Sequence, residues 1–250
     1  MSVNITEWSY SSVIQEIARL VGHPRPTDPA GSTDPAVQQM GAAVNFALEE
    51  LLTMSEWQDL TTRASLSVVA DSPGQVEKAF SLPDDFYRFV DQSQWSSASN
   101  LPAGGPVSNQ MWMQSVARAE SMQLTLYWQM RGDQIYFLYP PHPTSVTFDY
   151  MYLSTAQVQD ADTLTEYKNR ATKNGDAFLL DGFMIMLLAR ARYLEWKGFD
   201  AGAAVRDFLN IFNSRAGASK GAPVITLAPS RFSGVLLHPV YSLPNTGYGS

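Results

Sequence analysis

The fold depends most on residues 176–200, DAFLLDGFMIMLLARARYLEWKGFD, the most apolar stretch of the chain. Asp176 is placed to cap the free backbone N–H groups of a helix over Ala177–Lys197. Gly198 is placed to end that helix in the left-handed conformation. At 1.5 Å per residue the predicted helix is about 31 Å long, which is about the diameter of a small domain.

This predicted helix is apolar around nearly its whole circumference. A helix of that kind must be buried on all sides. Because the chain has few other helices to cover it, we expect a neighbouring subunit to supply part of the cover. The residues predicted to lie in such a subunit interface are Phe178, Phe183, Met184, Met186 and Leu187.

Other helices are predicted near both ends of the chain. Apolar residues recur at helical spacing over Thr6–Val21 and again over Pro35–Met54, where Asp34 is the cap. Asp200 can cap a last helix over Ala201–Ala216. Because the link to the preceding apolar helix is very short, these two helices should form a helical hairpin.

Between the helices the pattern changes to short strands. We predict a hairpin in which Ala64–Val69 and Gln75–Leu82 are joined by a turn at Pro73-Gly74. Ser96–Val107 is interpreted as an exposed connection, followed by a helix over Asn109–Glu120. The remaining predicted strands are Tyr87–Val90, Leu124–Met130, Gln134–Tyr139 and Ser145–Leu153.

The order of these elements predicts an α+β fold. Helices from both ends of the chain are expected to share one core, so that the strands form an insertion. The predicted architecture is a helical bundle ring domain with an inserted antiparallel β domain and an extended C-terminal tail. The boundaries are 1–58 for the N-terminal helices, 59–155 for the β domain, 156–220 for the helical hairpin and 221–250 for the tail.

Composition excludes several classes of function. The chain has 250 residues, a net charge of −7 and no cysteine. An acidic chain is a poor candidate for wrapping nucleic acid, because that affinity comes mainly from cations. The absence of cysteine excludes disulfides, thiolate metal sites and cysteine nucleophiles. Only 16% of the residues are charged, against roughly 25% in ordinary soluble domains, so part of the surface should lie against a neighbour.

No targeting or membrane segment is predicted. The first ten residues contain Glu7 and no basic run, so we do not expect a secretory signal, and we expect the chain to be made in a cytoplasm. The apolar stretch Phe178–Trp196 does not contain enough uninterrupted apolar residues to span a bilayer. It contains the charged residues Asp181, Arg190 and Arg192.

The sequence contains no clear motif for binding a metal ion or a phosphate group. The three histidines lie far apart, none at the spacing that places two imidazoles on one helix face, and we interpret them as loop residues. No glycine-rich phosphate loop is present. We therefore expect no cofactor and no metal. The histidines are His23, His142 and His238.

Two functions other than a structural one remain open on the residues alone. Glu49-Glu50 or Asp84-Asp85 could serve a cell-wall-degrading glycosidase, if a facing site assembled around them. The β region could be a receptor- or carbohydrate-binding module that stacks sugars on tryptophan. The candidates for that stacking are Trp95, Trp112 and Trp128. Arg131-Gly132-Asp133 is interpreted as a hairpin turn.

Several segments of the sequence occur in a characteristic order. They are the helix that starts at Asp34-Pro35 and leads into SEWQDL (55–60), the strand exit FSLPDDF (80–86), the Pro140-Pro141 turn and the helix start DAFLLD (176–181), followed by a helical hairpin and a tail. In this order they resemble the head-to-tail adaptor proteins of tailed bacteriophages, especially the tail accessory factors of short-tailed phages. The resemblance covers roughly residue 34 to the carboxyl terminus.

The resemblance implies a structural virion protein without enzymatic activity. Identical subunits would form a ring of twelve beneath the portal protein at the head–tail junction after DNA packaging. The ring would help to retain DNA, which passes through the channel without specific binding, and would provide the docking platform for a downstream tail or nozzle protein and for tail fibres. No membrane partner is implied.

The resemblance also implies that the C-terminal tail clasps the portal. Residues 221–250 have no helical period, but apolar residues are scattered through them. The predicted portal-binding residues are Val224, Ile225, Leu227, Phe232, Leu236, Leu237 and Tyr241.

Overall fold

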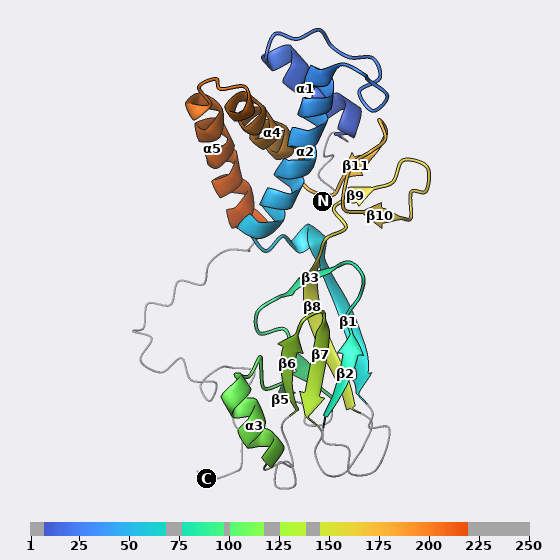
Figure 1. Ribbon diagram of the computed structural model, residues 1–250, viewed down its shortest axis with the longest axis vertical. Coiled ribbons are helices and arrows are strands. Elements are labelled where there is room, and N and C mark those ends of the chain that lie inside the picture. Colours follow the sequence, from blue (N-terminus) through green and yellow to red (C-terminus); the bar gives the residue numbers. More distant parts are fainter. Residues whose placement is uncertain (1–7, 69–76, 98–100, 118–125, 139–145, 220–250) are drawn as a thin grey trace, which may run out of the picture.

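The computed structural model describes residues 8–68, 77–97, 101–117, 126–138 and 146–219. The described residues form helices and antiparallel sheets, so the predicted mixed α+β class is confirmed. Figure 1 shows a helical part at one end and a β part at the other. The four helices of the helical part are α1 (Tyr10–Leu20), α2 (Pro35–Met54), α4 (Gly182–Trp196) and α5 (Gly202–Ser219).

The N-terminal helices start at the caps that their sequences provide. Ser9 caps α1 by accepting a hydrogen bond from the Ser12 backbone N–H, so the described helix begins at Tyr10. The start predicted at Thr6 lies outside the described residues. The Asp34 carboxylate accepts from the Ala36 N–H at 2.8 Å, and α2 begins at the following proline as predicted.

The predicted start of the apolar helix is wrong by five residues. Ala177–Phe178 forms a short strand, β11, and Asp181 rather than Asp176 caps α4 through the Phe183 N–H at 2.9 Å. Asp176 is not a cap because its carboxylate is used by the loop that precedes it. The other end was predicted correctly, since Gly198 takes the left-handed conformation at φ +75°.

Helix α4 is covered mainly by other helices of the same chain. It packs against α1, α2 and α5, and this placement buries Met184, Met186 and Leu187. The chain itself therefore supplies the cover that the sequence assigned to a neighbouring subunit. Phe178 is half-buried, whereas Phe183 is 39% exposed and remains open to a partner.

Both ends of the chain contribute to one hydrophobic core. The core contains the apolar faces of α1 and α2, most of α4, and Phe208 of α5. Trp57 and Leu153, which lie where the chain passes to and from the β part, belong to the same core. The β part is therefore anchored at both of its ends in the helical part, as Figure 1 shows.

The β part consists of two antiparallel sheets around an aromatic core. Phe148 contacts Phe137 of the other sheet with ring centroids 4.8 Å apart, and Trp128 lies beside them. One sheet contains β1 (Thr61–Val68), β3 (Phe86–Phe89), β4 (Trp95–Ser96), β5 (Leu101–Pro102) and β8 (Val146–Ser154). The other contains β2 (Glu77–Ser81), β6 (Tyr127–Arg131) and β7 (Gln134–Leu138).

The predicted hairpin between the first two strands is wrong. β1 pairs with β8 from Thr61↔Leu153 to Val68↔Val146, whereas β2 pairs with β7 in the other sheet. Because β1 and β2 lie in different sheets, the apolar side chains of both strands face the aromatic core between the two sheets. The predicted turn at Pro73-Gly74 lies outside the described residues.

Other parts of the β region agree with the predictions more closely. Arg131-Gly132-Asp133 turns the chain between β6 and β7, with Gly132 at φ +64°. Ser108 accepts from the Met111 N–H at the start of α3 (Asn109–Ala117). The connection predicted over Ser96–Val107 is not simply exposed, because Ser96 pairs with β8 and both end residues are buried.

The structure makes one glycine essential to the packing of α4. A Cβ added at Gly182 would lie 2.1 Å from the Trp8 Cβ. Gly182→Ala is therefore expected to lower the free energy of unfolding by about 1–3 kcal/mol, measured by urea denaturation.

Gly217→Ala is the matched control, since a Cβ there meets nothing within 4 Å and should stabilise exposed helix by up to about 1 kcal/mol. Equal effects of the two substitutions would contradict this packing.

Candidate functional site

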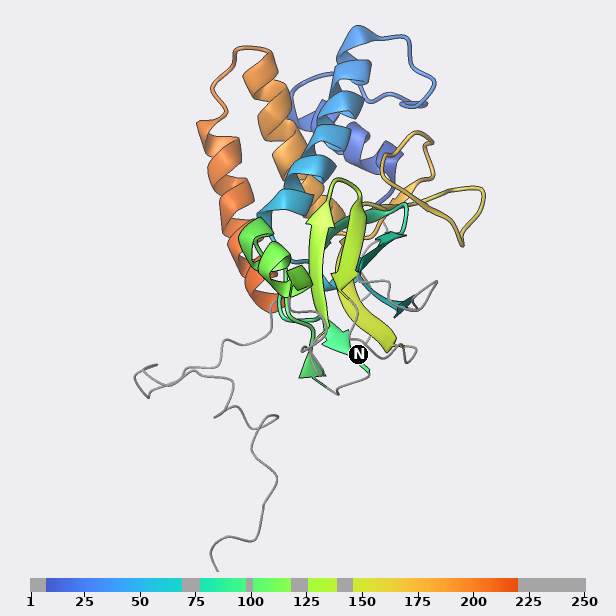
Figure 2. The same ribbon diagram turned by 60° about the horizontal axis from the view of Figure 1, so that its bottom comes forward.

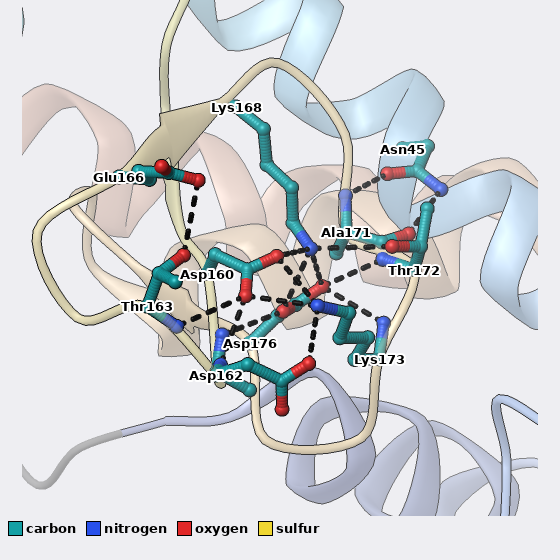
Figure 3. Close-up of polar contacts among 11 residues, drawn as sticks. Asn45, Asp160, Asp162, Thr163, Glu166, Lys168, Ala171, Thr172, Lys173 and Asp176 are labelled. Atoms are coloured by element: carbon teal, nitrogen blue, oxygen red, sulfur yellow. Dashed lines mark hydrogen bonds and ion pairs between the residues drawn. The ribbon is translucent and has the colours of Figure 1, made fainter.

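The segment between the β part and α4 is held against α2. It contains three short strands, β9 (Val158–Gln159), β10 (Tyr167–Lys168) and β11 (Ala177–Phe178), which pair in the order β10-β9-β11. The Asn45 side chain of α2 accepts from the Ala171 N–H at 2.9 Å and donates to its carbonyl at 3.1 Å, as Figure 3 shows. This paired contact fixes the β10–β11 connection on α2.

Asp176 lies at the centre of a charged network in this segment (Figure 3). Its side chain is 0% exposed and receives the Thr172 and Lys173 backbone N–H groups at 2.7 and 2.8 Å, and the Lys168 ammonium group at 2.9 Å. Burial opposes ionisation, but these hydrogen bonds outweigh it and hold the pKa of Asp176 below its ordinary value. The residue is therefore a buried carboxylate that orders the loop around it.

A second carboxylate extends the network toward the surface. Asp160 is 2.8 Å from the Lys168 ammonium group and 2.9 Å from that of Lys173. These two lysines hold the pKa of Asp160 far below its ordinary value. Lys173 also contacts Asp162 at 2.6 Å, and its pKa is raised by both carboxylates. Two lysines and three aspartates thus connect β9, β10 and the start of β11.

The loop between β9 and β10 is ordered by these contacts and by its own hydrogen bonds. This β9–β10 loop, residues 160–166, closes through the Asp160 N–H to the Glu166 carbonyl at 3.0 Å and through the Glu166 N–H to the Thr163 carbonyl at 2.8 Å. Leu164 at its tip is nevertheless 68% exposed, and Tyr167 beside it is 51% exposed. The charged network therefore supports a loop whose apolar side chains, Leu164 and Tyr167, are exposed to solvent.

A second group of exposed apolar residues lies on the hairpin formed by α4 and α5. The side chains of Trp196, Phe199 and Leu209 are about half exposed or more, and we call these three residues the hairpin face. Trp196 also packs edge-on against Phe46 of α2, with ring centroids 5.8 Å apart. Exposed apolar groups of this kind are typical of contact surfaces.

The carboxylate pairs that could have served a glycosidase have structural partners. Glu49 pairs with Arg170 at 2.7 Å, and Glu50 pairs with Arg192. Asp85 accepts hydrogen bonds from Tyr152 at 2.9 Å and from Ser154 at 2.6 Å, joining the start of β3 to β8. These contacts give Glu49, Glu50 and Asp85 roles in packing the elements together, whereas Asp84 is exposed.

The tryptophans proposed for sugar stacking are not a shared platform. Trp112 and Trp128 are buried, and the Trp112 indole N–H donates to Glu77 at 2.9 Å. Trp95 is half-buried in β4. The β part therefore uses two of these three rings to pack its core and to attach α3.

The remaining predicted residues give no further site. His23 lies 3.2 Å from Asp34, and the other two histidines lie outside the described residues. Within the described ranges, no cluster of acidic residues and histidines could hold a metal ion, and no helix is long and apolar enough to span a bilayer. The predicted portal-binding residues, Val224, Ile225, Leu227, Phe232, Leu236, Leu237 and Tyr241, also lie outside the described residues.

The sequence analysis missed the charged network. Its signal is the density of aspartate and lysine between residues 160 and 176, where turn residues such as Asn174-Gly175 separate the charges. The sequence analysis assigned Asp176 to a helix cap and therefore missed that signal. A capping aspartate and a buried loop aspartate cannot be told apart in the sequence, because both precede an apolar run.

Comparison with known protein families gives a match over most of the chain. A family described as SU10 adaptor protein matches residues 8–228, which include the helical part, the β part and the charged network. No curated protein matches the chain.

Removing the central carboxylate should destabilise the protein strongly. Asp176→Ala leaves the Lys168 ammonium group and three backbone N–H groups without this buried acceptor, and we expect a loss of about 3–5 kcal/mol in urea denaturation. Asp162→Ala is the control, since its carboxylate is 73% exposed, and it should have little effect. A stable Asp176→Ala protein would contradict the role assigned to the network.

The network also predicts a pH dependence. The folded-state pKa values of Asp160 and Asp176 are depressed, so their stabilisation is fully present above the unfolded pKa of about 3.9 and is lost as pH falls through the folded values. The stability difference between wild type and Asp176→Asn should be constant from about pH 7 to pH 5 and shrink below about pH 4. A difference that grows on acidification would show that the carboxylate is not ionised in the fold.

Proposed function

The chain belongs to the SU10 adaptor protein family, a phage head–tail adaptor family, and from this membership we propose that its copies form a ring of twelve beneath the portal protein. The family is structural, so the role is that of a connector rather than of an enzyme. The ring would complete the connector after DNA packaging. The observation that carries the proposal is the family match over residues 8–228.

The helical part suits the wall of such a ring. Its core is assembled from helices at both ends of the chain and also takes in Leu153 of β8, so helices far apart in the sequence are packed into one unit. The β part extends away from it along the long axis of the molecule, as Figure 1 shows. We assign to the β part the docking of a downstream tail or nozzle protein and of tail fibres.

The segment after α5 is assigned to the portal. Residues 221–250 follow directly on the helical part and carry the scattered apolar residues predicted to bind it. A segment that becomes extended on a partner can add its backbone and side chains to the partner's surface. The proposed position in the virion is therefore the head–tail junction, with the portal above the helical part and the tail protein below.

The charge of the chain suits a channel that DNA passes through. Each subunit has a net charge of −7, and a ring multiplies that charge around the channel. Like charges raise the energy of phosphate near the wall, so DNA is expected to pass without specific binding while the assembled ring helps to retain it.

Native mass spectrometry of isolated portal rings mixed with the chain tests this proposal. We expect up to twelve copies per portal ring for the full-length chain and none for a chain that ends at residue 220, although the shorter chain should remain folded by circular dichroism.

A finer comparison keeps the length of the tail unchanged. The double substitution Leu236→Ser and Leu237→Ser should weaken portal binding, and the control Ser230→Ala with Ser233→Ala should not. Full binding by the shortened chain would remove the role assigned to the tail, and no binding by the full-length chain would remove the adaptor function itself.

A further inference from the structure

We infer that the β9–β10 loop of one copy docks onto the hairpin face of the next copy, with Leu164 and Tyr167 packed against Phe199 and Leu209. This inference rests on the proposed ring and names the surfaces that would join its subunits. The occupant of each surface is therefore a second copy of this chain.

The first argument is the placement of the two surfaces. Figures 1 and 2 both show α5 and the β9–β10 loop on opposite sides of the helical part. A closed ring is built from heterologous contacts, in which one patch of each subunit meets a different patch of the next. Exposed apolar side chains on these two opposite sides of the helical part provide such a pair, whereas a twofold dimer would need only one surface.

The second argument is the rigidity of the loop. Asp160, Lys168 and Lys173 cross-link its base, and the fully buried Asp176 ties that base to the backbone of residues 172–173. A surface that is already ordered loses little conformational entropy on binding. The hydrogen bonds and ion pairs at the base of the loop that carries Leu164 are consistent with a preformed element that inserts into a partner.

The third argument is the match between the surfaces. Leu164 is 68% exposed on the loop, and Phe199 is 64% exposed on the hairpin face. Apolar side chains that are central in a contact and become desolvated contribute most of its binding energy. Each side of the helical part thus offers apolar area that the chain does not cover by its own folding.

The fourth argument is charge. Among the described residues, neither Glu166 on the loop nor Arg206 on α5 has an oppositely charged partner, and the Glu166 carboxylate accepts only the Thr163 hydroxyl at 3.1 Å. Arg206 and Leu209 are three residues apart, so they lie on one face of α5. When Leu164 of one copy packs near Leu209 of the next, Glu166 comes close to Arg206. This charge pair would orient the two copies, while the apolar side chains form the centre of the contact.

Cysteine cross-linking on portal rings tests the inference directly, because the chain has no cysteine of its own. A chain with both Leu164→Cys and Leu209→Cys should form a ladder of covalent multimers on mild oxidation. Each single variant, and the control pair Leu164→Cys with Met113→Cys on the exposed side of α3, should not form the ladder. A ladder from the control pair, or none from the test pair, would overturn the inference.

Mixing of charged variants gives a second test that does not depend on disulfide geometry. Leu164→Asp disables one surface and Leu209→Asp the other, and each is expected to weaken ring assembly at least about tenfold. Mixed together, the two variants should form dimers and no larger species, because each retains one working surface. The control Met113→Asp should assemble as wild type does.

The outcomes separate this inference from the proposed function. If both charged variants still form rings on the portal, the subunit contact assigned here is wrong and the adaptor function stands. If Leu164→Asp forms rings but no longer binds the portal, the loop is a portal contact and the inference is also wrong. If the wild-type chain forms no ring with its portal, the proposed function fails.

Discussion

The structure depends on the burial of α4 between helices that come from both ends of the chain. Met184, Leu187 and their apolar neighbours leave water only when α1, α2 and α5 close around them. The chain must therefore return to its starting helices after it has formed the β part. This requirement explains why the strands form an insertion, anchored through Trp57 on the way out and Leu153 on the way back.

The return segment does more than connect the two parts. A buried carboxylate needs several donors, and Asp176 obtains them from the backbone of its own loop and from Lys168. Satisfying that charge orders residues 160–176, and the hydrogen bonds between Asn45 and Ala171 hold this segment on α2. The contacts that order this segment thus also place an apolar loop tip on the surface of the helical part, where we infer the contact between copies.

The sequence predicted those features that local chemistry determines. Asp34 and Gly198 act at helix ends whatever lies around them, and the turn at Gly132 follows from its position between two strands. It could not predict features that depend on partners distant in the chain. β1 pairs with β8, whose residues lie 78 to 92 positions further along the chain. Asp176 belongs to a loop network, and the cover of α4 by its own chain follows from how four helices pack. Among the predicted interface residues, Phe183 is exposed and its role in an interface stays a prediction. The β9–β10 loop has no apolar periodicity that could have revealed it in the sequence.

Cryo-electron microscopy of the chain assembled on its portal tests the central claim most directly. The account predicts a closed ring with the helical part as its wall, in which residues 160–167 of each copy contact α5 of the next. Isolated copies bound separately to the portal, or a ring joined only through the β part, would contradict it.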